Sequence, residues 1–413
     1  MDSNLRARFN AAFTPELYAR YLQTLASHFG PIPFRVAETP LFFTPELRDR
    51  FIAHALDLAA QLSTPEMIAC CKKAIPPRFD APNMDALPNT VQVDFAVVPG
   101  ARDGQLDGRL IELQGFPSLY AFMVRQADLW AEELDEIEGL REPWTALCAP
   151  TRAQGLDLLG RTLLGGCDPL ETVLVDIDPP SQKTFPDFVA TQELFGIEPV
   201  CVTQLIRRGN KLFRKRGGQE IQVKRIYNRL VFDELIAKKV ETPFDFRDEL
   251  DVTFCSHPNW YWAWSKFCLP LLDHPSVPRA RLLSSLDLSA LPEDLSGFVL
   301  KPLFSFAGAG VVIDVTREAI ARVPEAEREH WVLQDKITYA PALHTPAGNP
   351  VKAEIRVMLT RPPEDATFSP LLMLVRLSRG KMCGVDFNKD LDWVGGTIGM
   401  WPSSATSTRH GEI

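Results

Sequence analysis

The sequence of 413 residues lacks the features that mark several large classes of protein. It contains no apolar run close to the roughly 18 to 20 residues needed to span a bilayer, and its first residues do not form a basic-then-apolar signal pattern. It has no surplus of positive charge, because 44 Lys and Arg residues face 53 Asp and Glu residues, a net charge of -9. We therefore expect a cytoplasmic protein with no membrane and no nucleic-acid partner, and the oligomeric state stays open.

The cysteines also lack a functional pattern. The chain has 8 of them, but they form no CxxC motif, no metal-type pairing with histidine and no spacing typical of disulfides. Buried thiols in a reducing compartment are the expected state. The remaining composition, 46% hydrophobic and 23% charged, is that of a globular chain long enough for roughly two to three packed units.

Three expected helix starts share the motif Thr-Pro-Glu, which begins at Thr14, Thr44 and Thr64. The threonine hydroxyl can cap the first helical turn, proline suits the first helical position, and an acid is favourable near a helix N-terminus. We predict that residues 1–80 form a mainly helical region.

From about residue 90 the pattern changes to that of strands, at 91–98 and again at 109–115. An apolar strand at 171–178, a helical stretch at 188–195 and a further strand at 199–202 predict a β-α-β unit with parallel strands. Residues 81–250 are thus expected to form an α/β domain.

Polar residues on one strand face and at strand ends are candidates for binding a substrate. Glu112 and Gln114 lie two apart, so they share one face of a strand, and Ser118 lies in the turn after it. Asn228 and Arg229 lie where another apolar strand gives way to a loop, which is a common ligand position. A solvent-facing sheet edge explains Glu112 and Gln114 about as well.

The stretch Phe298 to Val311 joins an apolar strand, a lysine and a turn of small residues. Lys301 places an ammonium group at the end of the strand, and Gly308 and Gly310 let backbone amides approach an anion. This combination favours a nucleotide phosphate as ligand. An ordinary hairpin with a solvated lysine is the alternative.

A series of apolar strands and one polar segment follows, at residues 330–337, 351–359, 371–378 and 384–388. In this order the series resembles the nucleotide-binding core of the ATP-grasp superfamily, over roughly residues 255–401. The region from Glu112 to Glu234 is most similar to glutathionylspermidine-synthase-like proteins. The resemblance implies an α/β (α+β) fold with four parts: a helical region at 1–80, an α/β substrate domain at 81–250, an ATP-grasp-like domain at 251–402 and a flexible tail at 403–413.

The resemblance also implies roles for single residues. In such enzymes lysines neutralise the phosphates of ATP, small residues cover them, and a strand end meets the adenine. The implied ATP-binding residues of this sequence are Lys266, Lys301, Ser305, Gly308, Gly310, Gln334, Asp335 and Ile337. Arg356 and Arg376 are expected to hold the transferred phosphoryl group or the acyl phosphate, and an ion pair with Glu354 or a nearby acid is the rival interpretation.

The family carries one carboxylate on a strand and a later Glu-x-Asn pair, oxygen ligands that hold Mg²⁺ on the phosphates. Asp386-x-Asn388 is the segment of this sequence that is most similar to the Glu-x-Asn pair. Either Asp386 is the first ligand of a shortened site, or Asp386 and Asn388 form the pair and Glu354 completes it.

The function implied is that of an ATP- and Mg²⁺-dependent ligase that joins a carboxylate to an amine through an acyl phosphate, with small-molecule or peptide substrates. The departure at the metal site leaves a second hypothesis, a catalytically impaired nucleotide-binding or scaffold protein of the same fold. A Rossmann-type oxidoreductase is disfavoured, because Gly308-x-Gly310 lacks a well-placed third glycine and later acid. The sequence does not identify the acid or the amine.

Overall fold

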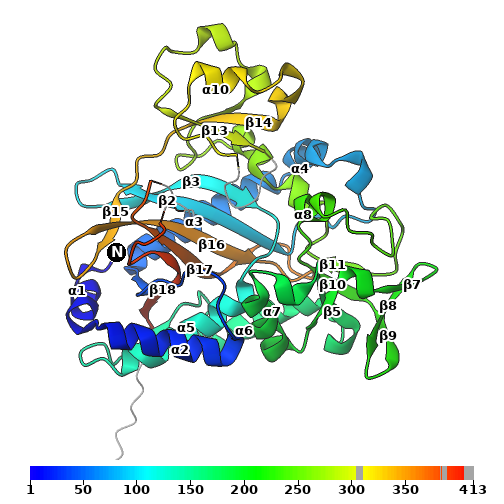
Figure 1. The fold of residues 1–413 in the computed structure, drawn as a ribbon, viewed down its shortest axis with the longest axis horizontal. Helices are drawn as coiled ribbons and strands as arrows, with labels where there is room; N and C mark the ends of the chain where they lie inside the picture. The colour runs from blue at the N-terminus through cyan, green and yellow to red at the C-terminus, as the bar shows by residue number, and fades with distance from the viewer. Residues whose placement is uncertain (304–309, 382, 384–387, 404–413) are drawn as a thin grey trace, which may run out of the picture.

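Figure 1 shows the fold in a computed structural model, which describes residues 1–303, 310–381, 383 and 388–403. Three of the predicted site residues, Ser305, Gly308 and Asp386, lie outside the described residues, as does 404–413 of the expected tail. Within the described ranges, no helix is both long enough and apolar enough to cross a membrane.

The α-helices of the described chain are α1 (Ser3–Ala12), α2 (Pro15–Phe29), α3 (Pro45–Leu62), α4 (Pro65–Cys71), α5 (Tyr120–Asp135), α6 (Arg152–Leu164), α7 (Phe185–Phe195), α8 (Phe232–Ala237), α9 (Trp260–Ala263) and α10 (Arg317–Ala321). The strands are β1 (Leu41–Phe42), β2 (Thr90–Pro99), β3 (Leu106–Gln114), β4 (Trp144–Thr145), β5 (Thr172–Asp176), β6 (Glu198–Cys201), β7 (Ile206–Arg208), β8 (Lys211–Arg216), β9 (Gln219–Val223), β10 (Arg225–Asn228), β11 (Thr253–Cys255), β12 (Ala280–Leu282), β13 (Phe298–Pro302), β14 (Trp331–Asp335), β15 (Pro341–His344), β16 (Pro350–Thr360), β17 (Ser369–Ser378) and β18 (Gly395–Pro402). A mixed α/β class is therefore confirmed.

The N-terminal helices α1 to α4 match the helical region expected at the start of the chain. Thr14, Thr44 and Thr64 cap α2, α3 and α4, because each hydroxyl accepts a hydrogen bond from the backbone N–H group three residues later. Each cap satisfies an N–H group that the first helical turn leaves without a partner inside the helix. The predicted capping role of the three threonines is thus confirmed.

The centre of the molecule is an eight-stranded sheet in the order β1-β18-β17-β16-β2-β3, with β15 paired to β16 and β4 paired to β18. The strands from β18 to β3 are antiparallel, and β1 joins β18 in parallel. α3 packs on β2, β3 and β16, and Gly108 of β3 permits this approach, since a Cβ atom there would lie 2.7 Å from the ring of Phe51. The sheet takes strands from both sides of residue 250, and the expected division into domains stays a prediction.

A second sheet consists of parallel strands in the order β11-β10-β5-β6. α7 connects β5 to β6, which confirms the predicted β-α-β unit. Between β6 and β10 the chain forms the antiparallel sheet β7-β8-β9, on the right of Figure 1. Arginines of this hairpin pair with acids, as Arg208 does with Glu220 at 2.8 Å.

A third, small sheet has the antiparallel order β12-β14-β13 and lies with α10 above the central sheet in Figure 1. It has an apolar core of its own, which includes Leu300 of β13, Leu333 of β14 and Ile320 of α10. After β13 the chain returns antiparallel to it, since Leu300 and Val312 exchange two backbone hydrogen bonds of 2.9 Å. The small sheet thus places Lys301, on β13, at the side of the central sheet.

Arg229, a predicted substrate-binding residue, lies in the interior next to the start of α5. Its guanidinium group forms an ion pair with Asp187 of α7, and the two side chains are 3% and 0% exposed. Asp187 also accepts hydrogen bonds from three backbone N–H groups at the start of α5. The neighbouring Asn228 stabilises a turn, because its side-chain oxygen accepts a 3.3 Å hydrogen bond from the N–H group of Leu230. In the described structure Arg229 therefore helps to hold α7 and the start of α5 together and Asn228 stabilises a local turn, and substrate binding by both stays a prediction.

Asp187→Asn should lower the free energy of unfolding by about 3 to 5 kcal/mol, because it leaves the buried charge of Arg229 without a carboxylate. Urea-induced unfolding followed by circular dichroism measures this difference. Glu220→Gln is the matched control, since its partner Arg208 is solvent-exposed and such pairs contribute little to stability. Equal effects of the two substitutions would contradict the assigned role of Asp187.

Candidate functional site

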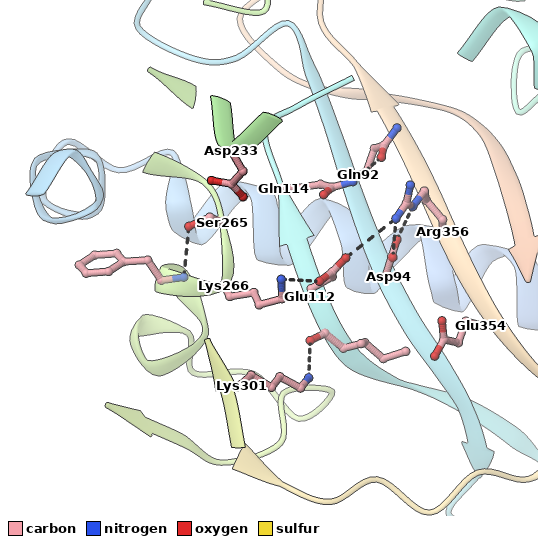
Figure 2. A network of polar contacts seen from close by, with 12 residues as sticks. Gln92, Asp94, Glu112, Gln114, Asp233, Ser265, Lys266, Lys301, Glu354 and Arg356 are labelled. Carbon is pink, nitrogen blue, oxygen red and sulfur yellow. Dashed lines mark hydrogen bonds and ion pairs between the residues drawn. The ribbon is translucent and has the colours of Figure 1, made fainter. Parts of the chain in front are cut away.

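Charged side chains gather where the central sheet meets the small sheet (Figure 2). Five of them come from β2, β3, β16 and β17, one from β13, and one from the short helix Lys266–Leu271. We call this group of three acids and four bases the charged network: Asp94, Glu112, Glu354, Lys266, Lys301, Arg356 and Arg376.

The pairing of the strands explains why these residues meet. Asp94 on β2 lies directly opposite Glu112 on β3 and Arg356 on β16. In the same way, Glu354 on β16 lies opposite Arg376 on β17. Residues directly opposite one another point to the same face of a sheet, with Cβ atoms about 4.5 to 5.5 Å apart. The antiparallel register thus places Asp94 beside Arg356 and Glu354 beside Arg376, and it also brings the like charges of Asp94 and Glu112 together.

Asp94 is the centre of the charged network and is only 1% exposed. Arg356 binds it in a bidentate manner, with nitrogen-oxygen distances of 2.6 and 2.7 Å, and Arg376 donates a further hydrogen bond to it. Arg376 also pairs with Glu354 at 3.0 Å, and the hydroxyl of Tyr339 donates a 2.7 Å hydrogen bond to Glu354. The ion pairs expected under the rival interpretation are therefore present, and phosphoryl binding by the two arginines stays a prediction.

The two lysines approach the central sheet at β3. Lys266 Nζ lies 3.4 Å from Glu112 Oε2, and Lys301 Nζ donates a 3.2 Å hydrogen bond to the carbonyl oxygen of Ile111. Burial lowers the pKa of Lys301 to about 8, although the negative charge of Glu112 acts against this shift. Burial raises the pKa of Glu112, but the positive charges of the nearby lysines and arginines outweigh it and lower this pKa to about 2. Glu112 is therefore held in its ionised form.

Gln334, predicted to contact adenine, lies within β14 and is 1% exposed. It pairs with Val299 on β13, the strand that carries Lys301. Neither atom of its side-chain amide has a hydrogen-bond partner among the described residues. Of the other predicted ATP-binding residues, Asp335 ends β14 and Ile337 follows this strand. Gly310 has a left-handed φ of 74°, a backbone angle that favours glycine. The small sheet thus contains a buried amide with unused hydrogen-bonding capacity, and adenine binding there stays a prediction.

Gln114 and Ser118 are linked through Gln92 of β2. Gln114 Nε2 donates a 2.6 Å hydrogen bond to Gln92 Oε1, and Gln92 Nε2 donates one of 2.6 Å to the carbonyl oxygen of Ser118. This direction turns the side-chain oxygen of Gln114 away from Gln92. Figure 2 places Gln114 next to Glu112, so Gln114 and Glu112 lie at the charged network. The hydroxyl of Ser118 instead accepts a 3.5 Å hydrogen bond from Arg229, whose partner Asp187 anchors the start of α5, and Asn228 stabilises the turn after β10.

Two of the residues predicted to hold Mg²⁺ can be located. Asn388 Oδ1, the atom that would bind the ion, accepts three hydrogen bonds of 3.0 Å. The donors are the hydroxyl of Ser378 and the backbone N–H groups of Arg379 and Gly380. Glu354 lies in the charged network, and Asp386 is outside the described residues. Within the part of the chain that the structure describes, no three His, Cys, Asp or Glu side chains are grouped to hold a metal ion.

Sequence reasoning missed Asp94 and Gln92, and it placed Asp233 with Asn228 and Arg229 at the end of an apolar strand without giving it a role. The signal for the first two was present, because Gln92 and Asp94 alternate with apolar residues in β2 just as Glu112 and Gln114 lie two apart in β3. Polar residues on one face of an otherwise buried strand indicate a polar site. Asp233 lies in the first turn of α8, and its place beside β3 depends on tertiary packing that a sequence pattern does not contain.

Comparison with known proteins gives a likeness of fold. No protein-family model and no curated protein matches the chain. The structure is similar to that of a glutathione synthetase-like effector from Globodera pallida, with a TM-score of 0.56 and 11% sequence identity over 88% of this chain and 94% of that one. A candidate γ-glutamylcysteine synthetase from Methylobacillus flagellatus KT matches with a TM-score of 0.40 and 12% identity over 81% of this chain and 84% of that one. At 11% sequence identity, the similarity to the Globodera pallida effector shows a shared fold and no more.

Asp94→Asn and Arg356→Met should be strongly non-additive in their effects on stability. Each single substitution breaks the same buried pair, so the coupling energy should lie between about 0.5 and 3 kcal/mol. Denaturant unfolding of the two single variants and the double variant measures it. Asp94→Asn combined with Arg208→Met, in the exposed hairpin, is the control cycle and should be additive. Additivity in the first cycle would contradict the role given to Asp94.

Proposed function

We propose that the protein binds ATP between the small sheet and the central sheet and uses it to join a carboxylate to an amine through an acyl phosphate. The observation that carries the proposal is the meeting of Lys266 and Lys301 with the acids and arginines of the central sheet. The shared fold with a glutathione synthetase-like effector supports it. The substrates proposed are a small-molecule or peptide acid and an amine.

The charges of the network favour an anionic ligand. It contains four basic and three acidic side chains, and burial makes the ammonium group of Lys301 costly to keep charged. A phosphate group next to Lys301 relieves this cost, because an opposite charge favours the protonated form. Lys266 and Lys301 bind the phosphates of ATP in this proposal, and the unsatisfied amide of Gln334 binds the adenine edge.

Phosphoryl transfer to a carboxylate needs groups that hold the reacting oxygens in place. Arg356 and Arg376 supply planar guanidinium groups for this purpose, and Asp94 fixes their orientation through its bonds to both. When bound, Mg²⁺ neutralises phosphate charge. Glu112 and the side-chain oxygen of Gln114 fit it in chemical type, because they are oxygen donors on one strand face and resemble the Glu-x-Asn pair.

A second candidate function is nucleotide binding without turnover. It is favoured by the way the acids are engaged, since Asp94, Glu112 and Glu354 each lie within 4.0 Å of a basic side chain. The side-chain oxygen of Asn388 is likewise committed to the turn after β17. A metal ion would have to compete with these partners.

ADP release separates the two candidates. Protein incubated with ATP, Mg²⁺ and a panel of acids and amines should release ADP only when a suitable acid is present, with amide product when the amine is also added. The assay couples ADP to a spectrophotometric signal and detects the product by mass spectrometry. Binding of a non-hydrolysable ATP analogue without ADP release for any pair would contradict the ligase and leave the nucleotide-binding protein.

ATP affinity should depend on pH through Lys301. Its ammonium group is charged below a pKa of about 8 and loses its proton above it, so the Kd of an ATP analogue should rise up to about tenfold between pH 7 and pH 9. Lys301→Arg keeps the charge and should weaken this pH dependence, whereas Lys301→Met should weaken binding about 10- to 150-fold at pH 7. Calorimetric titration measures both. Wild-type affinity in Lys301→Met would exclude Lys301 from the phosphate site.

A further inference from the structure

Asp233 stands beside the charged network but differs from its acids. It lies in the first turn of α8, is half-buried, and points toward the region of Gln114 and Lys266 in Figure 2. The hydroxyl of Tyr261 donates a 3.2 Å hydrogen bond to Asp233 Oδ2. Tyr261 in turn packs edge-on against Phe116, which follows β3, with ring centroids 5.5 Å apart. The carboxylate is thus oriented by contacts that lead back to the strand of Glu112.

The three acids of the charged network have basic partners, whereas Asp233 has a neutral one. Asp94 and Glu354 pair with arginines, and Glu112 lies 3.4 Å from Lys266. For Asp233, no basic nitrogen of the described residues lies within 4.0 Å, and its hydrogen-bond partner there is a neutral phenol. Burial raises the pKa of Asp233, although the hydroxyl of Tyr261 and the charge of Lys266 act against the shift. A half-buried carboxylate without a basic side chain within 4.0 Å among the described residues is stabilised by a cation.

We propose that Asp233 binds the ammonium group of the amine substrate. The inference rests on the proposed ligase function, in which one substrate is an amine that is protonated at neutral pH. The carboxylate accepts charge-assisted hydrogen bonds from the ammonium group, and Tyr261 fixes its orientation. Asp233 thereby sets a preference for cationic amines over neutral nucleophiles. A role limited to α8, in which an acid favours the first helical turn, is the alternative.

The test measures amine binding by calorimetry, with and without Mg²⁺ and a non-hydrolysable ATP analogue, for glycinamide, 1,3-diaminopropane and spermidine. Asp233→Asn, which keeps the shape and removes the charge, should weaken binding of the best of these amines at least about tenfold. Its affinity for the ATP analogue should stay within about twofold of wild type. Glu234→Gln is the matched control and should bind the amine like wild type, because Glu234 next to Asp233 pairs with Lys238 at 2.6 Å.

Three results would overturn the proposal: no amine of the panel binds the wild-type protein, Asp233→Asn binds the amine like wild type, or Glu234→Gln loses as much affinity as Asp233→Asn. If Asp233→Asn does not fold, Tyr261→Phe decides, because it keeps the charge and removes the orienting hydroxyl. Tyr261→Phe should weaken amine binding about two- to tenfold, and unchanged binding would contradict the proposed role of Asp233. Failure of the ATP analogue to bind the wild-type protein would count against the ligase function. The amine titrations without nucleotide would then still test whether Asp233 binds the amine.

Discussion

The sharing of one buried carboxylate by two arginines is the constraint on which the site depends. Asp94 is almost completely buried, so its charge has to be balanced by Arg356 and Arg376 rather than by water. These three side chains come from β2, β16 and β17, so their contacts exist in one register of the central sheet. A shift of one residue in any of these strands would turn its side chain to the opposite face and break the network.

Lysines from outside the central sheet complete this arrangement. Lys301 reaches from β13 to a backbone carbonyl of β3, and Lys266 reaches Glu112 from a separate short helix. The low pKa of Lys301 records the cost of burying its charge. An anionic ligand between the two sheets would lower that cost, which is the physical reason for the phosphate site that we propose at Lys301.

Local structure was predictable where a local interaction decides it. The threonine caps of α2, α3 and α4, the strands β2 and β3, and the β-α-β unit follow from spacing and composition. Five residues of the predicted site, Glu112, Lys266, Lys301, Arg356 and Arg376, do gather, and the sequence also named Glu354 as an ion-pair partner. The role of Asp94 as the shared partner was not predictable, because the pairing of β16 with β2 joins residues more than 250 positions apart. Arg229 shows the same limit, because its ion pair with Asp187 depends on how α7 packs against α5.

The most direct test is a crystal structure of the protein with Mg²⁺ and a non-hydrolysable ATP analogue. We expect phosphate oxygens within hydrogen-bond distance of Lys266 and Lys301, adenine next to the amide of Gln334, and the ion near Glu112. A nucleotide bound elsewhere, with the contacts of the charged network unchanged and both lysines remote from its phosphates, would contradict the proposed ATP site.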